Sequence, residues 1–130
     1  MTLVVDASAV VTLVLDPSAR GEAIARELAG GDLHAPDHLP VEVANVIRRL
    51  RHAGRLVESE ALLALDGFWQ LPVRLWPFEP LVERVWGLGA NLTSYDAAYV
   101  ALAEHIGGTL VTADERIARS PGIGCPVRVV

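Results

Sequence analysis

Four acidic residues stand where predicted strands end or predicted helices begin, and they are the residues best suited to chemistry. Asp6 directly follows the first apolar run of the chain, and Asp114 comes two residues after the TLVT run. Glu42 and Asp96 each fall in the first turn of a predicted helix. In a parallel sheet, ligands collect at the carboxyl ends of the strands, and the helices that follow start at that same edge. We therefore expect the four carboxylates to lie along one rim.

Carboxylates crowded in this way raise one another's pKa, and a divalent cation relieves the crowding by supplying the opposite charge. All-oxygen ligands suit Mg²⁺ or Mn²⁺ rather than Zn²⁺. We expect Asp6, Asp96 and Asp114 to bind the metal and Glu42 to act with them as a fourth catalytic acid. The reaction that such a site performs is hydrolysis of a phosphodiester, in which the metal orients the phosphate and activates a water.

Each acid also has a purely structural interpretation. An aspartate after a strand caps the next helix, and Glu42 in a first turn interacts well with the helix dipole. Asp96 follows Thr93 in a capping-box pattern, and Glu115 follows Thr112 in another. Taken one at a time, each acid is more simply a capping or first-turn residue. Four at one predicted edge are harder to explain in this way, but the pattern alone leaves both interpretations open.

Strands alternate with helices along the whole chain. The spacing of apolar residues and the Gly and Pro breaks predict strands at 2–5, 33–35, 73–76, 109–112 and 126–130, and helices at 7–15, 18–28, 40–52, 59–70, 79–88 and 94–106, with a short one from 114. This alternation is typical of β-α-β units. We therefore predict an α/β fold, a three-layer α/β/α domain with a mainly parallel central sheet.

Composition limits the other possibilities. The 130 residues suit a single domain over 1–130, and one cysteine excludes an intramolecular disulfide framework. No apolar run is long enough to cross a membrane, and the N-terminus lacks the basic start of a signal peptide, so a cytoplasmic protein is the simplest interpretation. A net charge of −5 does not favour a protein that coats nucleic acid, although an enzyme with a local basic rim is compatible with it.

Four further residues are candidates for supporting roles. Ser8 is placed to hydrogen-bond Asp6 or a metal-bound water, or else it is a helix-start hydroxyl. Thr112 either orients Asp114 or caps the next helix. Asn45 shares a helix face with Glu42 in an apolar setting, so it either positions Glu42 or a neighbouring loop, or makes a local backbone hydrogen bond. The fourth candidate is Arg116, which lies beside the predicted site and is suited to contact a phosphate.

A run of arginines follows the second acid at 48, 49, 51 and 55, and is either a solvated helix face or a surface for RNA phosphates or an acidic partner segment. All eleven basic residues are arginine, so the chain has no lysine. That absence disfavours a haloacid-dehalogenase-like phosphatase and a receiver-type signalling domain, both of which need one. The phosphatase would also need an acid where Ser8 stands.

The chain resembles the PIN-domain ribonucleases, and within them the VapC-type toxins of bacterial toxin–antitoxin pairs. The resemblance covers nearly the whole chain and rests on VVDASAVV at 4–11, PVEVANVIRR at 40–49 and LTSYDAAYVALAEHIGGTLVTADERIAR at 92–119. The acids of that family pattern fall on Asp6, Glu42, Asp96 and Asp114. Many relatives carry a further Asp or Asn shortly after the fourth acid, where this chain has Glu115, Arg116 and Ile117. That departure leaves open whether one metal ion binds or two.

The resemblance implies an endoribonuclease dependent on Mg²⁺ or Mn²⁺ that acts on structured RNA. It also implies a homodimer and a VapB-type antitoxin as partner, which occupies the acidic groove, often with an arginine. The alternative from a different class is a PIN-fold interaction module whose acids no longer support nuclease activity. Loss of RNA cleavage in a folded Asp6→Ala or Asp96→Ala variant distinguishes the two.

Overall fold

A five-stranded sheet forms the centre of the computed structural model, which describes residues 1–130. Its order is β3-β2-β1-β4-β5, and all four neighbouring pairs are parallel. The strands are β1 (Thr2–Val5), β2 (Asp32–Pro36), β3 (Val73–Trp76), β4 (Thr109–Thr112) and β5 (Val127–Val129). The chain moves outward from β1 to β3, then returns to the other side of β1. Direction changes beside β1, which is where α/β sheets place their ligands.

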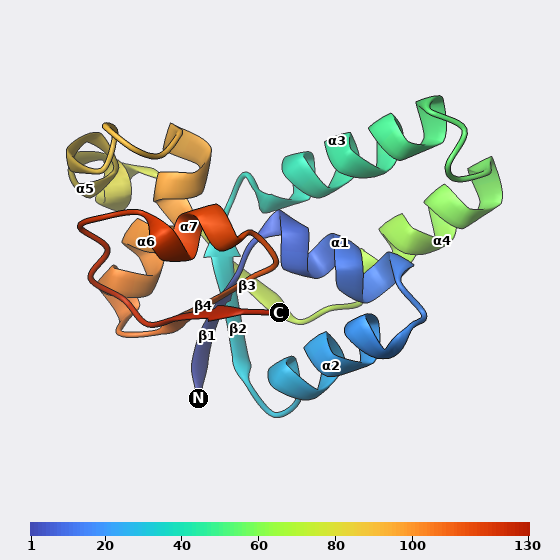
Figure 1. Cartoon of the computed structure of the whole chain (residues 1–130), viewed down its shortest axis with the longest axis horizontal. Helices are drawn as coiled ribbons and strands as arrows, with labels where there is room; N and C mark the ends of the chain where they lie inside the picture. Colours follow the sequence, from blue (N-terminus) through green and yellow to red (C-terminus); the bar gives the residue numbers. More distant parts are fainter.

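Helices cover both faces of the sheet, as Figure 1 shows. On one face lie α1 (Ala7–Leu15), α2 (Ala19–Leu28), α3 (Leu39–His52) and α4 (Glu58–Trp69). On the other lie α5 (Val82–Gly87) and α6 (Ser94–Ile106), while the short α7 (Glu115–Arg119) lies beside β5. The predicted three-layer α/β/α domain is confirmed, and the sheet is wholly rather than mainly parallel.

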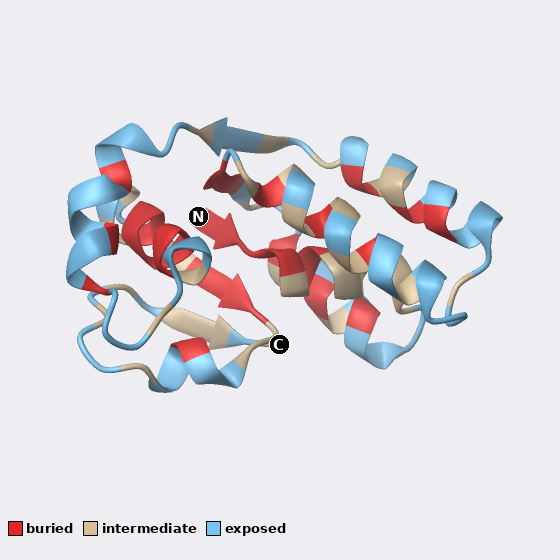
Figure 2. Ribbon diagram, turned by 90° about the horizontal axis from the view of Figure 1, so that it is seen from above, coloured by how far each residue is buried: buried red, intermediate tan, exposed pale blue.

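The core is densest around β1 and α6. Leu3, Val4 and Val5 are buried because β1 has a strand on each side and helices on both faces. Every residue of α6 from 97 to 103 is buried, including Tyr99, and Figure 2 shows this helix as a red segment against the sheet. A helix enclosed on all sides is positioned more firmly than a surface helix. The first turn of α6, which carries Asp96, therefore has a well-fixed support.

α3 and α4 form a helical hairpin that projects beyond the sheet (Figure 1). Gly54 adopts a φ of 73° at the turn between them, in the left-handed region that residues with a Cβ rarely occupy. Val43 and Ile47 of α3 face the core, whereas the arginines near its end are exposed. The hairpin thus presents a long polar and partly apolar outer surface that starts next to Glu42.

Three predicted boundaries need correction. The helix predicted over 79–88 is divided into a 3₁₀ turn, η1 (Glu79–Leu81), followed by α5. Pro80 lies in that turn, where its missing N–H costs no helical hydrogen bond. The last helix begins at Glu115, because Asp114 caps it rather than belonging to it. The final strand is shorter than predicted, at Val127–Val129.

No helix is both long enough and apolar enough to cross a membrane.

Candidate active site

Asp6 is a buried carboxylate at the carboxyl end of β1, where it also caps α1. Its side chain is only 5% exposed and accepts hydrogen bonds from Ala9 N at 3.0 Å, from Ser8 Oγ at 2.7 Å and from Thr112 Oγ1. Burial raises the pKa of Asp6, and these hydrogen bonds act against that rise. Three donors therefore hold this carboxylate in one orientation while its charge remains poorly solvated.

Asp96 lies in the first turn of α6, capped by Thr93, whose Oγ1 accepts from Asp96 N at 3.2 Å. The pKa of Asp96 is raised, first by partial burial and then by the negative charges of Glu42 and Asp114. The capping-box interpretation of Asp96 is therefore correct for its backbone but incomplete. Its side chain also faces other carboxylates, which a simple cap does not need.

Two aromatic side chains hold Glu42, and the sequence did not single out either. Tyr99 Oη donates to Glu42 Oε1 at 2.8 Å, and His38 Nε2 lies 3.0 Å from the same oxygen without a well-aligned hydrogen bond. Burial raises the pKa of Glu42, but Tyr99 and His38 outweigh that effect and leave it below its usual value. Both could have been found from helical spacing: His38 is four residues before Glu42, and Tyr99 is three after Asp96.

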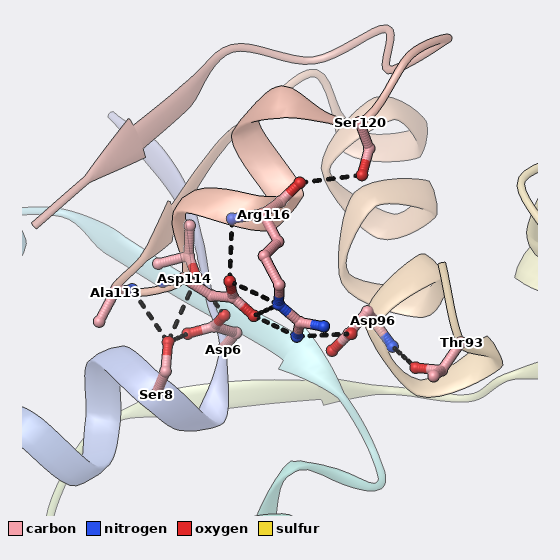
Figure 3. A network of polar contacts seen from close by, with 9 residues as sticks. Asp6, Ser8, Thr93, Asp96, Ala113, Asp114, Arg116 and Ser120 are labelled. Carbon is pink, nitrogen blue, oxygen red and sulfur yellow. Dashed lines mark hydrogen bonds and ion pairs between the residues drawn. The ribbon is translucent and has the colours of Figure 1, made fainter. Parts of the chain in front are cut away.

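Arg116 lies between two of the acids, as Figure 3 shows. Its guanidinium contacts Asp114 Oδ2 at 2.6 Å through Nη2, with Nε 3.1 Å from Oδ1, and Nη2 lies 3.8 Å from Asp96 Oδ2. Asp114 also accepts from the backbone of Arg116 at 2.9 Å. These contacts lower the pKa of Asp114. An arginine therefore provides, within this chain, the positive charge that the carboxylates need.

The four acids line one hollow of about 360 Å³. Ser8, Thr12 and Tyr99 are among its other lining residues. Thus the structure brings together the four residues that the sequence places at one rim, from β1, α3, α6 and the loop after β4.

The residues fit a hard divalent cation. Asp6 and Asp96 have raised pKa values, which means that the protein compensates their negative charge incompletely. The ligand atoms that they offer to a metal are carboxylate oxygens, which hard cations prefer. No three of the chain's His, Cys, Asp and Glu side chains are yet arranged closely enough to hold an ion. Side-chain rotation, together with movement of the exposed Arg116, is therefore needed to complete a set of ligands.

Two expectations for supporting residues need correction. Asn45 is exposed rather than in an apolar setting, because Val43 and Ile47 take the buried face of α3 and position 45 points away from it. It does not hold Glu42, which Tyr99 and His38 hold instead. For Thr112 the capping alternative is wrong, because Asp114 caps α7. In keeping with the orienting alternative, the Thr112 hydroxyl accepts from Asp114 N at 3.0 Å, and it also donates to Asp6.

Ser8 meets both of its predicted roles and adds a third. It lies at the start of α1, donates to Asp6, and accepts from Ala113 N at 2.9 Å. Ser8 and Thr112 are also within 3.2 Å of each other. Their two hydroxyls thus tie the end of β1 to the loop that follows β4.

A model of the PIN domain matches residues 3–123 of the sequence. The chain belongs to the PIN domain family. This PIN domain is 42% identical over 128 residues to ribonuclease VapC12 of Mycobacterium tuberculosis, an alignment that covers 98% of each chain. It therefore groups with the VapC ribonucleases.

Solved structures agree on the fold of this PIN domain. The crystal structure of PAE2754 from Pyrobaculum aerophilum superposes with a TM-score of 0.70 at 23% identity, covering 98% of this chain and 89% of that one. VapBC2 from Rickettsia felis, crystallised with a DNA fragment from its promoter, gives 0.74 at 13% identity, covering 100% and 99%. The architecture is thus shared where little sequence identity remains.

Proposed function

We propose that this VapC-type PIN domain is a Mg²⁺- or Mn²⁺-dependent endoribonuclease that hydrolyses phosphodiester bonds of structured RNA. The observation that carries the proposal is the gathering of Asp6, Glu42, Asp96 and Asp114 around one hollow at the carboxyl edge of a parallel sheet. Likeness to a named ribonuclease over almost the full length supports the reaction class.

Within this proposal, the carboxylates of Asp6, Asp96 and Asp114 hold the metal. When bound, the cation activates a water and stabilises the charge on the attacking and leaving oxygens. Ser8 and Thr112 fix the Asp6 carboxylate by hydrogen bonds, so that it needs little reorganisation when the metal binds.

Glu42 is held differently, by Tyr99 and His38, which keep its pKa below the usual value. We assign it to accept a proton from the attacking water, a role that needs an ionised carboxylate within hydrogen-bond reach. Arg116 is 75% exposed and contacts Asp114, which lines the hollow. Once displaced from Asp114, its guanidinium is placed to contact a phosphate of the substrate.

The partner proposal is that the chain acts as the toxin of a type II toxin–antitoxin pair, binds a VapB-type antitoxin and forms a homodimer. Large exposed apolar residues support an interface: Val41 is 71% exposed, Leu63 71%, Trp69 68% and Trp86 88%. Leu63 and Trp69 share α4, so that helix is the strongest candidate for the interface, because exposed apolar side chains that gather in one place mark contact surfaces.

The test is cleavage of a total-RNA pool by the purified, antitoxin-free protein, with Mg²⁺ or Mn²⁺ compared with EDTA. We expect discrete fragments with either metal, none with EDTA, and none with a folded Asp96→Asn variant. Glu83→Gln, an exposed acid on α5, is the matched control and should cleave like the wild type. Absence of cleavage by folded wild-type protein at any metal concentration would favour the interaction-module alternative.

A further inference from the structure

A second hollow adjoins the acidic one. It has a volume of about 480 Å³ and is lined by Val41, Glu42, Ala44, Asn45, Arg48 and Tyr95. Glu42 lines both hollows, so they meet at a residue of the proposed catalytic set. The second hollow is therefore next to the acids, within reach of a polymer that crosses them.

Tyr95 is the most distinctive residue of this hollow. It directly precedes Asp96 in the first turn of α6, yet its side chain is 62% exposed, whereas the residues after Asp96 are buried. A third hollow of about 300 Å³, which includes His38 and Phe78, also has Tyr95 in its wall. Open space thus lies on both sides of the tyrosine.

The ring of His38 packs against the ring of Tyr95. The two rings meet at a steep angle of 72° with centroids 5.6 Å apart, and His38 makes a similar contact with buried Tyr99, at 68° and 5.1 Å. Edge-to-face contacts of this kind fix the orientation of a ring. Tyr95 is therefore an exposed aromatic side chain with a defined orientation, linked through His38 to the residues that hold Glu42.

We propose that the second hollow is a nucleotide subsite, in which an unpaired base next to the cleaved phosphate stacks on Tyr95. Asn45 supplies both hydrogen-bond donors and an acceptor for the edge of that base. Arg48 supplies a positive charge for the adjoining phosphate. The inference rests on the proposed nuclease function and adds a substrate class to it, a single-stranded segment of RNA with a splayed-out base.

The chemistry of the hollow favours RNA over other occupants. Sequence-specific recognition of RNA uses unpaired bases stacked on aromatic side chains and hydrogen-bonded along their edges. An aromatic, an amide and a guanidinium are the side chains that this requires, and all three are exposed here. The polymer also has to cross the acids for cleavage, and continuity through Glu42 places its neighbouring nucleotide at Tyr95.

The test uses a library of hairpin RNAs in which four loop positions are randomised. The wild type and each single variant are compared for cleavage of this library in Mn²⁺. Tyr95→Ala should raise KM roughly tenfold to hundredfold, the size of one lost base–aromatic stack, with little change in kcat. Tyr95→Phe should behave like the wild type because the ring remains. Asn45→Ala should broaden the nucleotide preference at one position beside the cut.

Arg48 has a matched control in Arg49, which is also exposed on α3 but does not line the hollow. Arg48→Ala should reduce the slope of log KM against log salt concentration by about one, and Arg49→Ala should leave that slope unchanged.

Two outcomes would overturn different parts of the proposal. If the wild type cleaves RNA and Tyr95→Ala has the same KM and nucleotide preference, the subsite proposal is wrong and the nuclease proposal stands; this is the result expected if the hollow binds only a protein partner. Wild type that cuts no RNA would overturn the nuclease proposal itself. Mn²⁺-induced thermal stabilisation of Tyr95→Ala should equal that of wild type, which separates a lost subsite from a damaged metal site.

Discussion

Arg116 is bound to Asp114 through both nitrogens of one edge of its guanidinium, at 2.6 Å and 3.1 Å, and lies 3.8 Å from Asp96. The side chain that the sequence assigned to a phosphate is therefore the countercharge of two proposed metal ligands. Arg116 is 75% exposed, so solvent screens the pair, and a divalent cation carries twice the charge of the guanidinium. Such a cation can therefore displace it. Arg116 can then neutralise the carboxylates before the metal binds and contact a substrate phosphate afterwards.

Arg116→Ala should raise the affinity for Mn²⁺ roughly two- to fivefold, because an exposed ion pair that competes with the metal is worth no more than that. Titration calorimetry without RNA measures the effect directly. Arg119→Ala is the matched control, since Arg119 lies on the same helix and pairs with Glu115 instead. Weaker Mn²⁺ binding by Arg116→Ala would contradict the competition and indicate that Arg116 orders the ligands.

Thr112→Val should destabilise the metal-free protein by about 1–3 kcal/mol, because it removes a hydroxyl that serves buried Asp6 and the backbone of Asp114. Valine has nearly the shape of threonine, so the loss reports hydrogen bonding rather than packing. Chemical denaturation measures it. Thr112→Ser keeps the hydroxyl and loses only the methyl group, so it should be more stable than Thr112→Val. A Thr112→Val variant as stable as the wild type would contradict the role of the hydroxyl.

Tyr99→Phe should reduce RNA cleavage and cost about 1–2 kcal/mol of stability, because the phenol donates to the half-buried Glu42 carboxylate. The pKa of Tyr99 is raised by burial and by Glu42, so the phenol remains a donor across the working pH range. Cleavage rates and thermal melts of Tyr99→Phe are compared with those of Tyr95→Phe, which loses an exposed hydroxyl. Similar results for both would show that the bond to Glu42 has no special role.

Glu104 gives a pH-dependent prediction away from the site. Arg84 holds it at 2.6 Å, Gly124 N donates to it at 2.7 Å, and the hydrogen bond from Arg84 lowers the pKa of Glu104. A carboxylate with a lowered folded-state pKa stabilises the protein above its unfolded pKa of about 4.3, and this contribution disappears as the pH falls through the lower folded value.

Glu104→Gln should therefore cost about 1 kcal/mol at pH 7, a modest figure because solvent screens the half-exposed Arg84. The difference from wild type should shrink as the pH falls below about 4. Urea unfolding at several pH values tests this. Glu115→Gln removes the exposed pair with Arg119 and should have almost no effect at any pH; a Glu104→Gln deficit that stays constant with pH would rule out the ion pair as its cause.

Much of the fold and the site could be predicted because local patterns determined them. The alternation of apolar strands and helices predicted every strand, and strand ends together with first helical turns identified the four acids. Contacts between distant segments were not predictable in that way. The hydrogen bond from Tyr99 to Glu42 joins positions 57 residues apart, and it depends on how α6 and α3, from opposite faces of the sheet, approach each other at its carboxyl edge.

Asn45 and Arg116 illustrate two further limits. Flanking apolar residues suggested a buried Asn45, but a helix turns by about 100° per residue, so neighbours in sequence take opposite faces. Arg116 was correctly predicted to lie near the site. Its contact with Asp114 was not predicted, because a flexible side chain can pair with any of several nearby charges. Spacing located both residues and failed to give their contacts.

The order of the strands also has a consequence for biosynthesis. β1 leaves the ribosome before the other strands of this sheet, yet it is the middle strand and needs both β2 and β4 as neighbours. Since β4 ends at Thr112 and Asp114 follows it, a growing chain has the first acids long before it has the last. Translation order therefore delays assembly of the acidic hollow until β4 and Asp114 have been made. A chain that ends before β4 has an unpaired strand edge and an incomplete site.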